Sequence, residues 1–229
     1  MNTPARPKVL VCDDEHQILR ALRVILRDAG FEALPAATAE EALDVAAVNQ
    51  PEAAIIDLVL PDGDGIELCR RLREWTDIPL IVLSAIGDED AKVRALAAGA
   101  DDYVTKPFGP RELVARLNAN LRRIRREPEA TVITSNGFEL DLARRTVRVG
   151  GEEVHLTPTE FDLLRQLATN RGRLMTHRDL LLSVWGPGYE DDTQVLRAHI
   201  ANLRRKIEPP DGPRLIRTDP GVGYRFTDG

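Results

Sequence analysis

A short apolar run that ends in a carboxylate, residues 53–58, constrains the fold of this chain more than any other stretch. The run has the length and composition of a buried strand, and it ends around Asp57. The residues that follow include Pro61, Gly63 and Gly65, which are typical of a loop. In an open α/β sheet, ligands bind where strands end and loops begin. Standing alone, Asp57 would be better explained as a cap of the next turn.

Three further segments that are predicted as strands are each followed by polar side chains. They are 8–12 before Asp13, Asp14 and Glu15, 79–83 before Ser84, and 101–105 before Lys106 and Pro107. If the strands are parallel neighbours, three carboxylates, a hydroxyl and an ammonium group converge on one edge. Clustered carboxylates repel one another unless a cation lies among them, and oxygen ligands suit Mg²⁺ better than zinc. A carboxylate beside bound Mg²⁺ can attack phosphorus, and a lysine can bind the phosphoryl oxygens.

Helical segments alternate with these strands. Thr38, with Glu41 three residues later, has the pattern of a capping box. The alternation predicts right-handed crossovers and a doubly wound, five-stranded parallel sheet of the α/β class, covered on both faces. The expected helices are 15–28, one from Thr38 to before Pro51, 64–74, 88–98 and 110–126, and a further strand is expected at 31–34.

The polar residues at these strand ends, in this order, resemble the receiver domain of two-component response regulators, which has a CheY-like fold. The resemblance covers the first half of the chain. It implies that Asp57 is the phosphoacceptor, that Lys106 contacts the phosphoryl group, and that the Lys106–Pro107 bond is cis, as proline permits. The Mg²⁺ ligands that it implies are Asp13 through water, Asp14, Asp57 and the carbonyl of Val59.

Ser84 and Tyr103 match the switch pair of the same family. Phosphorylation adds a charge of about −1.5 to −2 and new acceptor oxygens. The resemblance therefore implies that the Ser84 hydroxyl turns to a phosphoryl oxygen and that Tyr103 turns inward. The plainer alternatives are a loop hydroxyl and a half-buried strand aromatic, and the neighbouring cluster favours the switch.

A set of charged residues on the fourth expected helix, the last strand and the last helix has two interpretations. As a solvated face, it would contribute about 0.2–1 kcal/mol for each ion pair. The positions also match the symmetric dimer face of OmpR/PhoB-type regulators, which implies a C2 homodimer in which each pair occurs twice. The implied pairs between subunits are Lys92–Glu112, Asp102–Arg116 and Asp101–Arg123.

The charge of the chain is divided unevenly between its halves. Residues 1–121 hold 13 Lys and Arg against 21 Asp and Glu, a balance of −8. Residues 122–229 hold 18 against 16, a balance of +2. An acidic half is suited to binding cations, and a mildly basic half is suited to nucleic acid.

The cysteines and the apolar segments both favour a cytoplasmic protein. Cys12 and Cys69 lie far apart, without a metal-like spacing, and predict reduced thiols rather than a disulfide. Residues 1–7 hold no apolar signal segment, and no stretch is long enough to span a bilayer. The sequence therefore predicts a soluble protein without a membrane partner.

The second half of the chain predicts a meander, three helices and a final hairpin. The first helix begins at Thr157 as N-cap, with Pro158 at its first position and Glu160 at its third. Three helices followed by a hairpin predict an α+β winged helix-turn-helix domain. The expected strands are 138–142, 146–149, 153–156, 215–218 and 224–227, and the later helices begin at Thr176 and near Asp192.

The third of these helices, ending at Ile207, has an apolar and a polar face. The expected core residues are Leu196, Ile200, Leu203 and Ile207. Arginine, asparagine, glutamine and threonine carry the donors that base edges and phosphates require, although an ordinary solvated face explains the composition about as well. The residues expected to contact DNA are Thr193, Gln194, Arg197, Ala201, Asn202, Arg204, Arg205, Arg217 and Thr218.

The second half resembles the effector domain of OmpR/PhoB-type regulators, through residues 156–164, 182–186, 200–206 and 221–226. Residues 184–187 and 195–197 are similar to the branch of the family that regulates potassium-uptake operons. The chain departs from some relatives at the wing tip, where Pro220 takes the place of an arginine and leaves Arg217 or Arg214 as substitutes. His199 is expected to pack in the core or contact a phosphate rather than bind a metal.

Together the two resemblances imply a DNA-binding transcriptional response regulator, not an enzyme. The implied partners are a sensor histidine kinase, promoter DNA, RNA polymerase and, after phosphorylation, a second copy of the chain on tandem sites. The expected boundaries are 1–124 for the receiver, 125–130 for a linker and 131–229 for the winged-helix domain.

Three alternatives compete with this prediction. An aspartate-nucleophile phosphatase requires a second carboxylate two residues after the nucleophile, and Val59 stands there instead. A regulator that binds DNA without phosphorylation is disfavoured because the acidic set is complete. An OmpR/PhoB-type regulator of a different set of genes is a third possibility.

Overall fold

The structure is a computed structural model that describes residues 6–85, 89–124, 132–135, 137–208, 212 and 214–227, without the side chains of Glu89, Arg123 and Ile124. The chain divides into two compact units, Met1–Leu121 and Arg122–Gly229. The expected linker, residues 125–130, lies outside the described residues. Within the described ranges, no helix is both long and apolar enough to cross a membrane.

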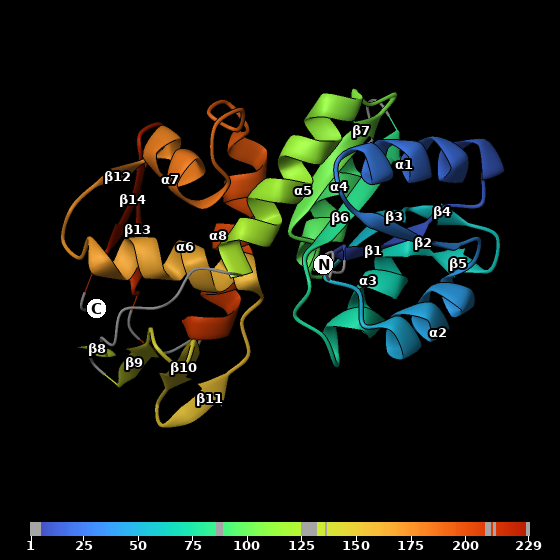
Figure 1. The fold of residues 1–229 in the computed structure, drawn as a ribbon. Coiled ribbons are helices and arrows are strands. Elements are labelled where there is room, and N and C mark those ends of the chain that lie inside the picture. The colour runs from blue at the N-terminus through green and yellow to red at the C-terminus, as the bar shows by residue number, and fades with distance from the viewer. Residues whose placement is uncertain are drawn as a thin grey trace, which may run out of the picture. The chain divides into compact units, whose positions relative to one another are not determined.

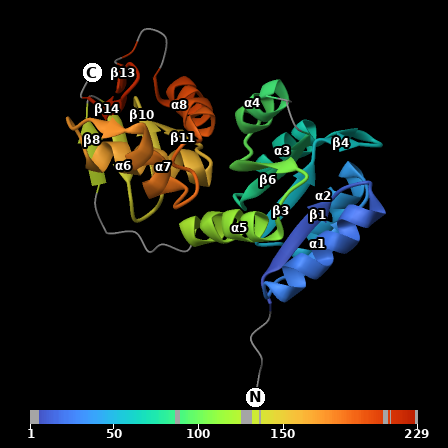
Figure 2. The ribbon, with the colours of Figure 1, turned by 90° about the horizontal axis from the view of Figure 1, so that it is seen from above.

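The first unit is a five-stranded parallel sheet with helices on both faces (Figures 1 and 2). The strand order is β2-β1-β3-β6-β7, so the winding direction reverses between β1 and β3. This confirms the predicted doubly wound α/β fold. The elements are β1 (Lys8–Cys12), α1 (His16–Asp28), β2 (Glu32–Ala36), α2 (Ala39–Asn49), β3 (Ala53–Asp57), β4 (Val59–Leu60), β5 (Gly63–Asp64), α3 (Gly65–Arg73), β6 (Leu80–Ala85), α4 (Glu89–Ala97), β7 (Asp102–Lys106) and α5 (Pro110–Ile124).

The central strands are buried on both faces, which explains their continuous apolar runs. Every residue of β3 is buried, and Ile55 and Ile81 on neighbouring strands have no exposed surface. On one face of the sheet, α1 and α5 bury leucines against these strands; each such side chain contributes about 1.5–3 kcal/mol. The leucines are Leu22, Leu26, Leu113, Leu117 and Leu121.

The start of α2 differs in part from the predicted capping box. The hydroxyl of Thr38 accepts from the backbone N–H of Glu41 at 3.1 Å, as expected. The Glu41 carboxylate, however, accepts from the backbone N–H of Ala37 rather than that of Thr38. Asp62, from the loop after β3, accepts from the first two backbone N–H groups of α2 at 2.9 and 3.0 Å. A long-range cap therefore joins this helix to the loop that follows Asp57.

The second unit holds a four-stranded antiparallel sheet, three helices and a three-stranded sheet, with strand orders β11-β10-β9-β8 and β12-β14-β13 (Figure 1). This confirms the winged-helix architecture and adds β8 and β12 to the expected strands. The elements are β8 (Val132–Ser135), β9 (Phe138–Asp141), β10 (Thr146–Val149), β11 (Glu152–Val154), α6 (Pro158–Thr169), β12 (Met175–Thr176), α7 (His177–Val184), α8 (Thr193–Ile207), β13 (Ile216–Asp219) and β14 (Gly223–Phe226).

Two of these helices begin with complete capping boxes. Thr157 and Glu160 exchange hydrogen bonds at the start of α6, as predicted, and Thr176 and Asp179 do the same at the start of α7. Each cap satisfies two backbone N–H groups that a helix start would leave unpaired. The capping box at Thr176 therefore fixes where α7 begins, directly after β12.

Candidate functional site

Three carboxylates gather at the C-terminal ends of β1 and β3, which are neighbours in the sheet. Asp13, Asp14 and Asp57 each offer an oxygen within 4.8 Å of the others. Asp13 is fully buried and Asp57 nearly so, whereas Asp14 is exposed. The predicted convergence of strand ends therefore holds for all three carboxylates.

Lys106 reaches this cluster from the end of β7. Its ammonium group donates to Asp13 Oδ2 at 2.7 Å and to Asp57 Oδ2 at 3.0 Å. The peptide bond between Lys106 and Pro107 is cis, as expected from the resemblance. The ammonium group thus occupies the position from which it could contact a group attached to Asp57.

The environment of Asp57 opposes its ionised form. Burial raises the pKa of this carboxyl above its ordinary value, and the charge of Asp13 raises it further. The hydrogen bond and charge of Lys106 act in the opposite direction but do not cancel the increase. The pKa of Lys106 is raised because its contacts with Asp13 and Asp57 outweigh the effect of burial, which is the largest single effect and lowers it. The cluster would therefore be stabilised by additional positive charge.

The donors present at this edge fit Mg²⁺. Carboxylate oxygens are the hard ligands that this ion prefers, and three carboxylates beside one ammonium group leave an excess of negative charge. Val59, the residue expected to add a carbonyl oxygen, begins the β4–β5 hairpin two residues after Asp57. The residues present are thus compatible with the implied ion.

Gly65, the first residue of α3, packs against the backbone that carries Asp57. A Cβ atom at Gly65 would lie 2.0 Å from the carbonyl oxygen of Asp57, and the N–H of Gly65 donates to Leu58 at 2.9 Å. The sequence suggested only a loop glycine here, because nothing in the local pattern shows which backbone lies opposite.

We expect Gly65→Ala to displace the loop after Asp57 and to lower the rate of phosphorylation about tenfold or more, because small errors in positioning are costly in catalysis. Phosphorylation by acetyl phosphate would measure this. Gly63→Ala is the matched control, since nothing lies within 4 Å of a Cβ atom there. Equal rates in the two variants would contradict the expectation.

The expected switch residues lie on neighbouring strands beside the cluster. Ser84 is buried at the end of β6, and its hydroxyl has no hydrogen-bond partner among the described residues. Tyr103, on β7, is half-buried, and the ammonium group of Lys92 lies 4.7 Å from the centre of its ring. A buried hydroxyl without a partner costs free energy unless another acceptor arrives.

The expected dimer pairs are arranged differently in the single chain. Arg116 donates to Asp102 and to Glu112, both at 3.1 Å. The Asp102–Arg116 pair expected between subunits is therefore formed within one chain. The ammonium group of Lys92 lies over the ring of Tyr103.

Asp101 has its own partners within the chain. Its carboxylate forms a buried ion pair with Arg73 and accepts from the N–H of Leu80 at 2.9 Å. Only 1% of its surface is exposed. Within one chain the Asp101 carboxylate therefore faces the interior, and its expected contact with Arg123 of a second subunit stays a prediction; the side chain of Arg123 lies outside the described residues.

The polar face of α8 is narrower than the sequence indicated. Apart from Lys206, which pairs with Glu160 of α6, its exposed residues are spaced three or four apart and form one stripe, with Thr193 partly exposed at its start. The exposed stripe is Gln194, Arg197, Ala201 and Arg205. The predicted core residues of the opposite face are all buried, and His199 packs on Trp185 with ring centres 5.4 Å apart.

Two residues expected to face outward have partners within the chain. Asn202 is 4% exposed and accepts a hydrogen bond from Arg205. Its amide is therefore buried, whereas the sequence predicted that it would face outward. Arg204 donates to the carbonyl of Ile216 at 2.7 Å and to the hydroxyl of Thr218 at 2.8 Å. A helical periodicity cannot distinguish a solvent-facing arginine from one that meets a distant strand.

We expect Arg197→Ala to weaken binding to all DNA sequences similarly and to reduce the slope of log affinity against log salt by about 1, the loss of one phosphate contact. Arg197 is exposed at the centre of the stripe. Titrations by fluorescence anisotropy at several salt concentrations would measure the slope. Arg165→Ala on α6 is the control, and an unchanged slope for Arg197→Ala would count against its role.

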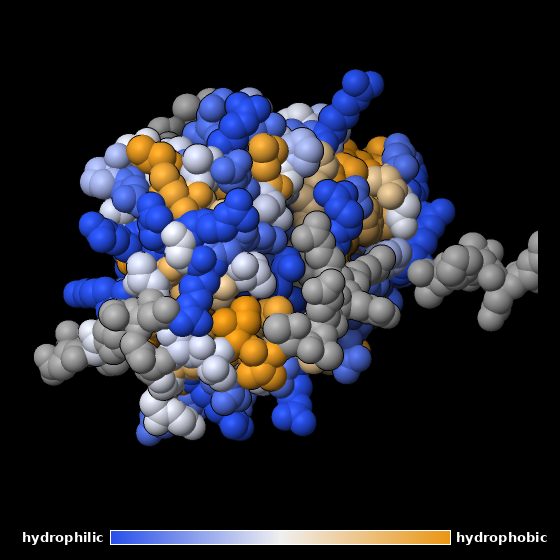
Figure 3. Space-filling model, turned by 90° about the vertical axis from the view of Figure 1, so that its left-hand side faces the viewer, coloured by the Kyte–Doolittle hydropathy of each residue, from blue (hydrophilic) through white to orange (hydrophobic). Residues whose placement is uncertain are grey.

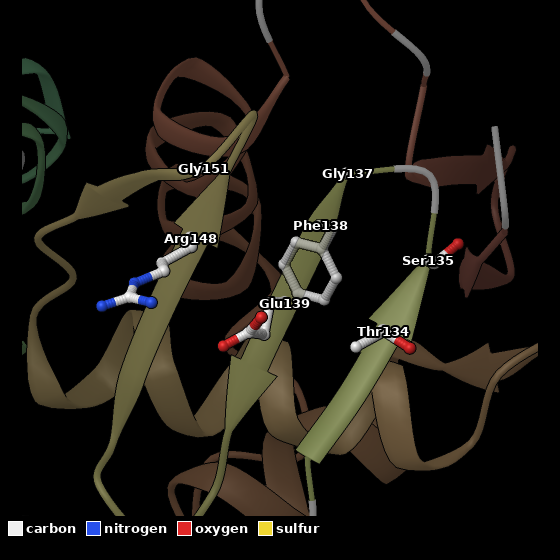
Figure 4. Close-up of a pocket in the computed structure, with 7 residues that line it drawn as sticks. All are labelled: Thr134, Ser135, Gly137, Phe138, Glu139, Arg148 and Gly151. Carbon is white, nitrogen blue, oxygen red and sulfur yellow. The ribbon is translucent and has the colours of Figure 1, made fainter.

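Outside these sites, the described part of the chain shows no second cluster of metal-ligating side chains. Figure 3 shows a mainly hydrophilic face on which hydrophobic residues gather in small separate groups. A pocket on the four-stranded sheet has Glu139 and Arg148 side by side on neighbouring strands (Figure 4). Its lining residues are Thr134, Ser135, Gly137, Phe138, Glu139, Arg148 and Gly151. None of them belongs to the residues that the sequence singles out.

The chain matches two protein families. Residues 9–118 match the response regulator receiver domain, and residues 151–226 match the C-terminal domain of transcriptional regulatory proteins. Among solved structures, DrrB of Thermotoga maritima, an OmpR/PhoB homologue, has a TM-score of 0.53 and 32% identity and covers 97% of this chain and 100% of its own. A RitR mutant with a TM-score of 0.78 and 24% identity, covering 97% of this chain and 100% of its own, shows the fold alone.

Similar curated proteins extend over nearly the whole chain. The transcriptional regulatory protein KdpE of Mycobacterium tuberculosis is 51% identical over 221 residues, covering 95% of this chain and 98% of its own. The KDP operon transcriptional regulatory protein KdpE of Escherichia coli is 47% identical with the same coverage. The chain therefore belongs to the two-component response regulators of the OmpR/PhoB type and is a KdpE-like, DNA-binding member of that family.

Proposed function

We propose that Asp57 accepts a phosphoryl group from a sensor histidine kinase and that phosphorylated chains pair and bind tandem sites in promoter DNA. The observation that carries this proposal is the cluster in which Asp57 lies beside Asp13 and is bound by Lys106. The buried hydroxyl of Ser84, without a partner among the described residues, supports it.

An oxygen of Asp57 attacks the phosphorus of a phosphohistidine, and the P–N bond breaks with its electron pair passing to the imidazole. The residues that would hold Mg²⁺ are Asp13, Asp14, Asp57 and the carbonyl of Val59; the ion, when bound, offsets negative charge on the phosphoryl oxygens. Lys106 then binds a phosphoryl oxygen, and Ser84 donates its hydroxyl to another. Tyr103 moves inward from its contact with Lys92.

Release of Lys92 and Arg116 from their contacts within the chain makes them available to a second subunit. Lys92 would then pair with Glu112 of the partner, and the pairing places two winged-helix domains on adjacent half-sites. Binding of one domain raises the effective concentration of the other. The DNA contacts that we propose are Thr193, Gln194, Arg197, Ala201, Arg205 and Arg217. The proposed boundaries are 1–124 and 131–229, joined by 125–130.

The target genes that we propose are those of potassium transport, the kdp operon. The support is 47–51% identity with proteins named KdpE, extending over both domains. The kinase would be KdpD-like, the DNA-bound dimer would contact RNA polymerase, and the chain would act in the cytoplasm as a regulator rather than an enzyme.

A selection of genomic DNA fragments, with and without beryllofluoride and Mg²⁺ to mimic phosphorylated Asp57, tests this function. We expect tandem repeats to be enriched mainly in the activated sample, including a fragment upstream of potassium-transport genes. Equal enrichment in both samples would show that DNA binding does not depend on phosphorylation of Asp57. Enrichment of other promoters alone would overturn the kdp assignment and leave the switch intact.

A further inference from the structure

The wing is the hairpin of β13 and β14. Side chains from the end of α8 bind the backbone along the outer edge of β13. In the strand order β12-β14-β13, no strand of the described residues lies on the outer side of β13. On that side, Ile216 donates its N–H to Glu208 Oε1 at 2.7 Å, and its carbonyl accepts from Arg204 at 2.7 Å. The N–H and C=O groups on the edge of a sheet usually face solvent. In Ile216 both groups are instead hydrogen-bonded, one to Arg204 of α8 and the other to Glu208, the C-cap of that helix.

Arg204 and Glu208 stand four positions apart, so their side chains lie on the same face of the helix. The Glu208 side chain is 1% exposed, and its Oε2 lies 4.0 Å from Arg204 Nε. Arg204 also donates to the hydroxyl of Thr218 at 2.8 Å. Its guanidinium lies 5.8 Å from the ring centre of Tyr224, the cross-strand partner of Thr218. We name these two residues, with their bonds to β13, the Arg204–Glu208 clamp.

The clamp orients the residue that lies between its attachment points. Ile216 and Thr218 face α8, and side chains alternate along a strand, so Arg217 lies on the opposite face of the wing and is exposed. The other edge of the wing is held by β12, and the N–H of His177 donates to Val222 at 2.9 Å. The wing is thus fixed on both sides, on one of them directly to the helix with the exposed stripe.

We propose that the Arg204–Glu208 clamp joins α8 and the wing into one DNA-reading unit, in which Arg204 is a positioning residue rather than a phosphate contact. The inference rests on the proposed function for the DNA contacts of Arg217. It explains why Arg204 directs its donors at the wing although it lies beside the exposed Arg205.

The test is a double-mutant cycle on the full-length chain activated with beryllofluoride and Mg²⁺, bound to an operator fragment and measured by fluorescence anisotropy. Arg217→Ala should weaken binding about tenfold in the wild-type background, in the range of one lost contact. Added to Arg205→Ala, the Arg217→Ala change should again weaken DNA binding about tenfold. Added to Arg204→Ala, it should weaken binding less than about twofold, because the effects of mutations at interacting residues are not additive. Arg205→Ala is the matched control, one residue away and exposed.

Two further measurements separate positioning from a general loss of structure. Thr218→Val leaves the helix untouched and removes one bond of Arg204, so it should also reduce the cost of Arg217→Ala. Hydrogen exchange should accelerate at the amide of Ile216 in Arg204→Ala while α6 remains protected. Equal costs of Arg217→Ala in all backgrounds, or no cost in the wild type, would overturn the clamp. A wild-type chain that bound no DNA fragment would instead refute the proposed function.

Discussion

Asp57→Asn should reduce phosphorylation by at least about 100-fold, because the amide oxygen that replaces the carboxylate is a poor nucleophile towards phosphorus. The stability of the protein should not fall. Burial and Asp13 raise the pKa of Asp57 in the folded chain, so the contribution of this carboxyl to the free energy of unfolding falls as pH rises through that pKa. At neutral pH, a neutral amide removes that unfavourable charge.

The incorporation of phosphate from acetyl phosphate, followed by mass spectrometry, would measure the effect, with urea unfolding in parallel. Asp62→Asn is the matched control, because Asp62 lies in the same loop and its carboxylate accepts from the backbone N–H groups of Ala39 and Glu40 at the start of α2. It should retain phosphorylation. Phosphate found on Asp57→Asn at the wild-type level would refute the assignment of the acceptor.

The architecture and the acidic cluster were predictable because they depend on local patterns. Apolar runs of strand length marked β1, β3 and β6. The polar ends of β1 and β3, with Lys106 at the end of β7, marked the edge where Asp13, Asp57 and Lys106 meet. Parallel strands bring such ends together whatever the details of packing. The existence of a site could therefore be inferred before any distance was known.

The partners of the arginines were not predictable, since they join segments far apart in sequence. Arg73 pairs with Asp101, which lies 28 positions later in the sequence. Arg204 binds Ile216 and Thr218 of the wing, which lie 12 and 14 positions later. Asp101 and Asp102 look alike in the sequence, yet they pair with different arginines on different helices. Helical periodicity placed Asn202 and Arg204 outside the apolar stripe but could not show that other side chains and strands cover them.

The buried pair of Arg73 and Asp101 leads to the second large effect, a loss of about 3–5 kcal/mol in the free energy of unfolding for Arg73→Ala. The Arg73 side chain is 8% exposed and also donates to the carbonyls of Thr76, Ile78 and Gly99. Its removal leaves Asp101 buried without its charged partner. Burying an unpaired charge is far more costly than losing an exposed pair.

Arg70→Ala is the matched control on the same helix, because the Arg70–Glu67 pair is 57% exposed on both sides and contributes about 0–1 kcal/mol. The chain has two tryptophans, one in each unit. In a Trp185→Phe background, the fluorescence of Trp75 reports unfolding of the receiver during urea titration. A loss for Arg73→Ala no larger than that for Arg70→Ala would show that water or a local rearrangement satisfies Asp101, and the pair would then contribute little to holding α3 against the start of β7.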